Sequence, residues 1–171
     1  SEDVVIKGAN ALYSTFENGE YTWYPVIMIA NLVGGTAGAF LGPVRARGVN
    51  LIMPVGLEKL IPLPITQLAA LDLGIKKIDY PLGLHFGTFP VVGAKVITEI
   101  EAGKELFELP MFPVGAGGVN GAEGAITLLT EGTEEKIKDA LKLIKSIKGE
   151  PPTQLNATEC KGCTIPCLNA E

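Results

Sequence analysis

Two apolar runs in this sequence each stop at glycine, and this pattern constrains the fold more than any other feature. The first run, Val4–Ile6, ends at Lys7–Gly8. The second ends at Val33 and is followed by Gly34–Thr36. Short apolar runs bounded by glycine are typical of buried strands. In open α/β sheets, ligands bind at the carboxyl ends of the strands, beside helix N-termini that favour anions. The sequence therefore predicts an α/β fold with a ligand site at these strand ends.

The composition indicates a globular chain. Its 171 residues are enough for one well-packed domain or two small lobes, and 47% of them are apolar. A net charge of −5 disfavours non-specific binding to nucleic acid. No apolar run reaches the roughly 18 residues that a membrane span needs, and the acidic start does not resemble a signal peptide. We therefore expect a soluble, cytoplasmic protein that binds neither nucleic acid nor membrane.

The first segment, residues 1–95, is predicted to be an α/β core domain with a mainly parallel sheet and flanking helices. Asn18–Gly19 is a strong signal for a tight hairpin. A strand at Tyr24–Leu32, a helix at Gly34–Arg47 and a strand at Val49–Val55 then follow in the order of a βαβ unit. Pro43 within that helix could mark a break.

Residues 96–150 are predicted to form a small α+β lobe, and residues 151–171 a tail that contains cysteines. The helix at Thr133–Lys148 has an N-cap, an apolar face of helical period and a glycine stop. Phe112–Gly115 and Ala125–Thr130 are strand-like. The glycine-rich run at 115–124 could approach a ligand closely or form a long hairpin turn.

The first group of candidate site residues follows the opening strand. Lys7 is costly at the end of an apolar strand unless its ammonium group reaches solvent or an anion. It is a candidate catalytic or anion-pairing residue, or alternatively a structural lysine. Gly8 and Asn10 are candidate ligand-binding residues, although Asn10 could equally hold the turn through its own side chain.

The second group follows the later strands. Gly34, Gly35 and Thr36 could bind an anion with backbone amides and a hydroxyl, or form an ordinary capped helix start. Glu58 is the candidate catalytic acid or base, and a solvated surface pair with Lys59 is the alternative.

The tail carries a possible metal site. Cys160, Cys163 and Cys167 are the only cysteines of the chain, spaced Cys-x2-Cys-x3-Cys. Three thiolates at this spacing can bind zinc or an iron–sulfur cluster, with the fourth ligand coming from Glu171, His85, a second subunit or a bound molecule. Free thiols or a redox-active pair are the alternatives.

Residues 3–60 resemble the sugar-phosphate isomerase and CoA-transferase-like α/β superfamily, which includes ribose-phosphate isomerase, methylthioribose-phosphate isomerase and lactate-utilisation-type domains. The resemblance rests on short motifs that occur here in the same order: Lys7–Leu12 with its Gly-Ala-Asn-Ala turn, Asn18–Gly19 and Gly35–Thr36. Asn10 stands where the isomerases carry an acidic residue. The resemblance implies an isomerase or transferase that acts on a sugar phosphate or an acyl thioester.

Two hypotheses of function follow. In the first, the chain binds an anionic small metabolite at the strand carboxyl ends and acts as an isomerase or transferase. In the second, it is a noncatalytic interaction subunit with a metal-binding or iron–sulfur tail. Superfamily members carry a further half before the first strand, so this hypothesis expects a homo-oligomer or a partner subunit to complete the fold.

Overall fold

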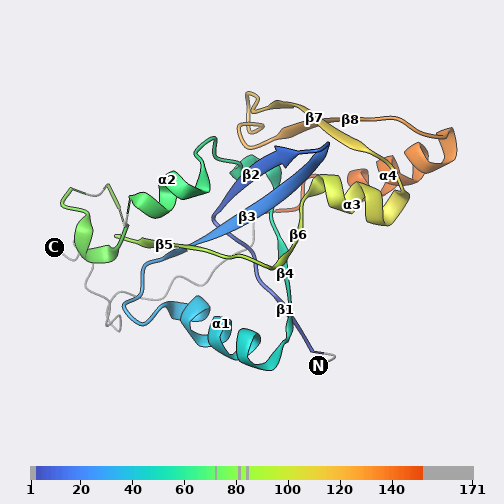
Figure 1. The fold of residues 1–171 in the computed structure, drawn as a ribbon. Coiled ribbons are helices and arrows are strands. Elements are labelled where there is room, and N and C mark those ends of the chain that lie inside the picture. The colour runs from blue at the N-terminus through green and yellow to red at the C-terminus, as the bar shows by residue number, and fades with distance from the viewer. Residues whose placement is uncertain (1–2, 72, 81, 84, 152–171) are drawn as a thin grey trace. The chain divides into compact units, whose positions relative to one another are not determined.

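The computed structural model describes residues 3–71, 73–80, 82–83 and 85–151 (Figure 1). The described chain divides into two compact units. The first contains residues 3–55 and 59–96, and the second contains residues 56–58 and 97–151. No helix in the described ranges is both long and apolar enough to cross a membrane.

One sheet contains the predicted opening strand. It has the order β1 (Val4–Ile6), β4 (Asn50–Pro54), β6 (Lys95–Ile97). β1 and β4 are parallel, with Val5 opposite Leu51. The backbone N–H of residue 7 extends this pairing by donating to the carbonyl of residue 52 at 3.0 Å. The carboxyl ends of β1 and β4 therefore lie side by side.

A second sheet is antiparallel, with the order β2 (Ala11–Glu17), β3 (Glu20–Ile29), β5 (Gly87–Pro90). The turn between β2 and β3 is the predicted Asn18–Gly19 hairpin. Asn18 and Gly19 have φ values of 54° and 84°, which are the positive angles that such a two-residue turn needs. The hairpin prediction is confirmed.

The prediction of a mainly parallel core is not supported. The expected βαβ unit does not form, because its first strand is part of β3 and its second strand is β4, in the other sheet. The Asn-Gly turn commits one edge of β3 to antiparallel pairing with β2, and β5 occupies its other edge. The helix between them, α1 (Gly35–Arg47), is as expected, runs through Pro43 and ends at Gly48 with φ 65°.

The antiparallel sheet is buried on both faces near the start of β2 and the middle of β3, and the outer half of the hairpin is exposed. Leu12, Pro25 and Ile27 lie on one face and are buried. Across the other face packs α2 (Ile65–Ala70). In Figure 1, α1 and α2 lie on opposite sides of the β3–β5 pair. The residues of the α2-side cluster are Ala11, Tyr13, Val26 and Leu68, with Tyr24, Leu63, Ile65 and Leu73 packed against them.

Two single-turn 3-10 helices complete the first part of the chain. η1 (Leu57–Lys59) follows β4, and η2 (Ile75–Lys77) precedes β5. Glycine precedes each of them, and each ends in lysine. These lysines are important for the site described below.

The second unit is a hairpin packed with two helices. Its elements are α3 (Glu99–Phe107), β7 (Met111–Ala116), β8 (Ile126–Thr130) and α4 (Glu134–Ile147). β7 and β8 are antiparallel, with a register shift between Pro113 and Gly115. The buried cluster of this unit is Leu109, Met111 and Ala140, with Ile100, Phe107 and Ile137 packed against it.

Local sequence determines the ends of these elements. α4 starts at the predicted cap, where the Thr133 hydroxyl accepts from the Lys136 N–H at 3.5 Å.

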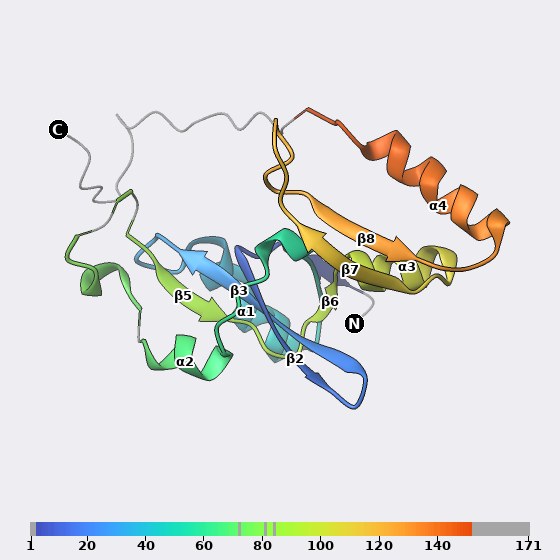
Figure 2. The same ribbon diagram turned by 90° about the horizontal axis from the view of Figure 1, so that it is seen from above.

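The glycine-rich run is a long hairpin loop that extends beyond β7 and β8 (Figure 2). It is closed by a bond from the Gly117 N–H to the Ala125 carbonyl at 2.8 Å. The run is thus a long hairpin turn, and its close approach to a ligand stays a prediction.

Candidate functional site

The turn after β1 brings together two lysine side chains. The Lys7 ammonium donates to the carbonyl of Gly8 at 3.1 Å, on the surface. The Lys59 ammonium donates to the next carbonyl, that of Ala9, at 3.0 Å and is partly buried. Both acceptors are neutral, so these bonds do not neutralise the two charges. The turn is therefore a locally cationic position at the carboxyl end of β1.

Asn10 has a structural role at this turn. Its side-chain oxygen accepts from the Met28 N–H at 2.9 Å, and its own N–H donates to the Val26 carbonyl at 2.9 Å. Asn10 thereby joins the start of β2 to β3. This bond accounts for the asparagine without a ligand and favours the turn interpretation.

The start of α1 is shaped by glycine and by a capping asparagine. Gly34 is the N-cap at φ 85°, and a Cβ there would lie 2.9 Å from the Cα of Gly38. The Asn31 side-chain oxygen accepts from the N–H groups of Val33 at 2.9 Å and Gly35 at 3.3 Å. Thr36 is therefore not the cap. It lies exposed in the first turn of the helix, where backbone N–H groups lack intrahelical acceptors.

A pocket of about 410 Å³ opens at this helix start. Gly34 lines it together with Lys76 and Lys77, which η2 carries, and Thr88 of β5. Ile29, at the carboxyl end of β3, also lines it. The positive end of the α1 dipole and two lysine side chains thus border one cavity, and this combination favours an anion.

The predicted site residues do not all line this pocket. Of the predicted Gly34, Gly35 and Thr36, only Gly34 lines it. Lys7, Gly8 and Asn10 are not among its lining residues either; they form the separate turn after β1. Glu58 belongs to the second compact unit, where its carboxylate lies against the backbone of Gly56. Its catalytic role and that of Lys7 stay predictions.

The predicted metal ligands of the tail, Cys160, Cys163 and Cys167, lie outside the described residues, as does Glu171. His85 is described, and one of its ring nitrogens, Nδ1, lies 2.8 Å from the carbonyl of Ile75. Its Nε2 atom is buried without a hydrogen-bond partner. Within the described ranges, no three His, Cys, Asp or Glu residues are grouped so that they could hold a metal ion.

The sequence patterns do not indicate the lysines that the fold adds to both positions. Lys59 was considered only as the surface partner of Glu58, and Lys76–Lys77 was not considered. The signal available for Lys76–Lys77 is the adjacent pair of cations after Gly74. Their approach to Gly34, about forty residues earlier in the chain, depends on tertiary structure.

Comparison with known protein families, with curated proteins and with solved structures finds no match for this chain.

Proposed function

We propose that this chain binds an anionic small metabolite in the pocket at the start of α1. The observation that carries the proposal is that Gly34, Lys76 and Lys77 line the same cavity of about 410 Å³. That volume falls within the roughly 300–1,000 Å³ of ordinary ligand pockets. The pocket also lies at the carboxyl end of β3, where the sequence predicts binding.

The ligand class in this proposal is a sugar phosphate or an acyl thioester. A phosphate group matches the positive end of the α1 dipole and the charge of the nearby lysines. The hydroxyl of Thr88 and the side chain of Asn31 add neutral polar groups for the remainder of the ligand. The resemblance of residues 3–60 to sugar-phosphate isomerases points to the same class. Catalysis by an isomerase or transferase, and the alternative of a noncatalytic subunit, stay predictions.

The test is a thermal-shift titration of the full chain with ribose 5-phosphate and coenzyme A, using ribose as the uncharged control. We expect an increase in Tm with the phosphorylated compounds only, since a ligand that binds the native state stabilises it. Lys76→Glu should abolish the increase. Lys142→Glu is the matched control, because it makes the same charge change on an exposed residue of α4.

Two outcomes would contradict the proposal. One is an equal increase in Tm for Lys76→Glu and Lys142→Glu, which would place binding elsewhere. The other is no increase with either phosphorylated compound in the unsubstituted chain.

A further inference from the structure

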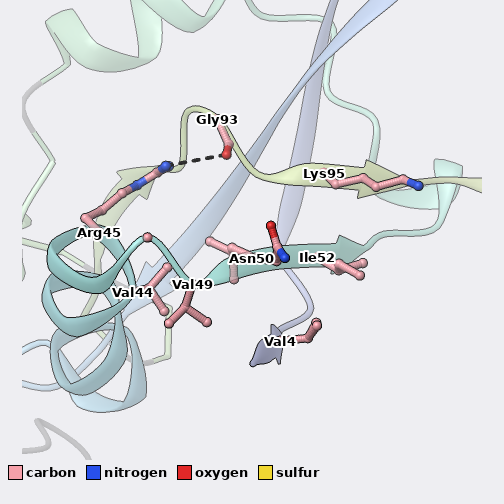
Figure 3. A pocket seen from close by; sticks show the side chains of 10 residues that line it. Val4, Val44, Arg45, Val49, Asn50, Ile52, Gly93 and Lys95 are labelled. Atoms are coloured by element: carbon pink, nitrogen blue, oxygen red, sulfur yellow. Dashed lines mark hydrogen bonds between the residues drawn. The ribbon is translucent and has the colours of Figure 1, made fainter. Parts of the chain in front are cut away.

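A second cavity lies at the other end of α1. It has a volume of about 580 Å³, which is also within the roughly 300–1,000 Å³ of ligand pockets. The last turn of α1 contributes Arg45, β4 contributes Asn50, β1 contributes Val4 and the loop before β6 contributes Gly93 (Figure 3). All of its lining residues belong to the first compact unit.

The Arg45 guanidinium is held in place by backbone carbonyls. One nitrogen donates to the carbonyl of Gly93 at 3.5 Å, and the other donates to that of Val92. Gly93 has φ +76°, and a Cβ there would lie 3.3 Å from both terminal nitrogens of Arg45. Glycine therefore permits the close approach that fixes the guanidinium.

These bonds leave Arg45 able to bind an anion. A guanidinium has five N–H donors, and the two carbonyls use only two of them. Both carbonyls are neutral, so the positive charge is not compensated by them. No ion pair of Arg45 is found in the part of the chain that the structure describes.

The rest of the lining mixes polar and apolar groups. Val4, Val49 and Ile52 contribute apolar side chains, and the Asn50 side chain rises from β4 between Val49 and Ile52 (Figure 3). Lys95 also lines the cavity, but its ammonium group points away from Arg45 in the same view. The cavity thus offers a guanidinium held by backbone carbonyls, an amide and the apolar side chains of Val4, Val49 and Ile52.

We propose that this cavity binds an organic monocarboxylate with an apolar body. The carboxylate accepts from the free N–H donors of Arg45 and from the Asn50 amide, because a guanidinium fork matches carboxylate geometry. The apolar body packs on Val4, Val49 and Ile52. A guanidinium and an amide beside three apolar side chains match both parts of such an amphipathic ligand. The site is separate from the pocket at the start of α1.

The probe is 4-phenylbutyrate, with 4-phenylbutanol and inorganic phosphate as controls. Each is titrated into the full, isotopically labelled chain, and the backbone amide signals are followed by NMR. We expect the signals of Gly48, Asn50 and Gly93 to shift with 4-phenylbutyrate. We expect the alcohol to bind about tenfold more weakly, since it lacks the charge-assisted bonds. Inorganic phosphate should cause smaller shifts at the same concentration.

Charge substitutions at Val4 separate this site from other anion sites. Val4 is 49% exposed, so both Val4→Glu and Val4→Lys are expected to fold. Both variants lose the contact of Val4 with the apolar body and differ only in charge, so Val4→Glu should bind 4-phenylbutyrate much more weakly than Val4→Lys does. Lys76→Glu should leave the binding of 4-phenylbutyrate unchanged, which keeps this test independent of the proposed function.

Three results would overturn the proposal. The first is equal affinity for 4-phenylbutyrate and 4-phenylbutanol, and the second is equal binding by Val4→Glu and Val4→Lys. The third is a failure of 4-phenylbutyrate to shift the signals of Gly48, Asn50 and Gly93. Dispersed NMR spectra of both variants confirm that they are folded.

Discussion

Single side chains in this protein carry charge in two different ways. Lys7, Lys59 and Arg45 all donate to neutral backbone carbonyls, which leaves their charges available to a ligand. Lys136 instead pairs with the carboxylate of Glu108. Only the first kind of contact is useful in a binding site. The pairing of Glu108 with Lys136 should instead make the stability of the fold depend on pH.

Glu108→Gln tests the surface pair. The hydrogen bond from Lys136 and the positive charge of Lys136 hold the pKa of the Glu108 carboxyl below its usual range. A carboxylate whose folded pKa is lowered stabilises the fold above its unfolded pKa, and the stabilisation is lost as pH falls through the folded pKa. We therefore expect Glu108→Gln to be less stable than the unsubstituted chain at pH 7, and the difference to shrink as pH falls from about 4.3 through the lowered folded pKa.

The measurement is urea denaturation between pH 3 and pH 7 at low ionic strength. The difference should be small and should shrink in 1 M salt, because both side chains are on the surface. Glutamine preserves the length of the side chain at φ 53°, so backbone strain is the same in both proteins. Glu131→Gln is the control, an exposed carboxylate. A Glu108→Gln difference that persists unchanged at pH 3 would contradict the assignment.

At the scale of elements, signals confined to a few adjacent residues predicted structure well. The Asn18–Gly19 turn and the α4 helix formed where their residues indicated, because turn angles and helix caps depend on neighbouring residues. The choice of partner strand could not be predicted in this way. Nothing local to β4 specifies that it pairs with β1 rather than with β3, because pairing depends on contacts between distant segments.

The same distinction holds for the candidate site. The sequence predicted a glycine-led helix start that borders the pocket, and Gly34 does line it. The presence of Lys76 and Lys77 at this pocket could not be predicted from the sequence, since it depends on how η2 packs beside β5. The hydrogen bond from the Met28 N–H to the Asn10 side chain could not be predicted either, because it joins β3 to the residue before β2.

Thr98→Ala tests how far a single cap stabilises α3. Thr98 is 3% exposed, and its hydroxyl accepts from the Ile100 N–H at 3.1 Å. Glu101 reaches back to the Thr98 N–H at 2.8 Å, which completes a capping box. We expect Thr98→Ala to lower the free energy of unfolding by about 1 kcal/mol, as loss of a threonine cap does elsewhere.

Urea denaturation monitored by far-UV circular dichroism measures that change, and Thr98→Ser is the matched control. Serine keeps the capping oxygen and should recover most of the loss. Thr98→Ser as unstable as Thr98→Ala would show that the buried methyl group, and not the cap, carries the effect.

At the scale of the whole molecule, each compact unit has a buried cluster of its own. In the first, α2 packs on the antiparallel sheet around Val26 and Leu68. In the second, Leu109 and Met111 pack with Ala140 of α4. Both candidate ligand pockets are lined entirely by residues of the first unit. The second unit therefore has its own stability determinants, and these can be altered without changing either pocket's lining.

Leu109→Ala tests this separation. Leu109 is 1% exposed, and a Cβ added at Gly132 would lie 2.3 Å from its Cδ2 atom, so the side chain is tightly enclosed. Deleting it leaves a cavity, and we expect the free energy of unfolding of the second unit to fall by about 2–5 kcal/mol. Hydrogen exchange of the amides in α3, β7, β8 and α4 measures the loss.

Leu106→Ala is the control, because Leu106 is 63% exposed and its truncation should cost less than about 0.5 kcal/mol. Since Leu109 lines neither pocket, ligand titrations of Leu109→Ala at a temperature where it stays folded should give unchanged affinities. Equal protection factors in Leu109→Ala and Leu106→Ala would contradict the role of Leu109 as the centre of this cluster.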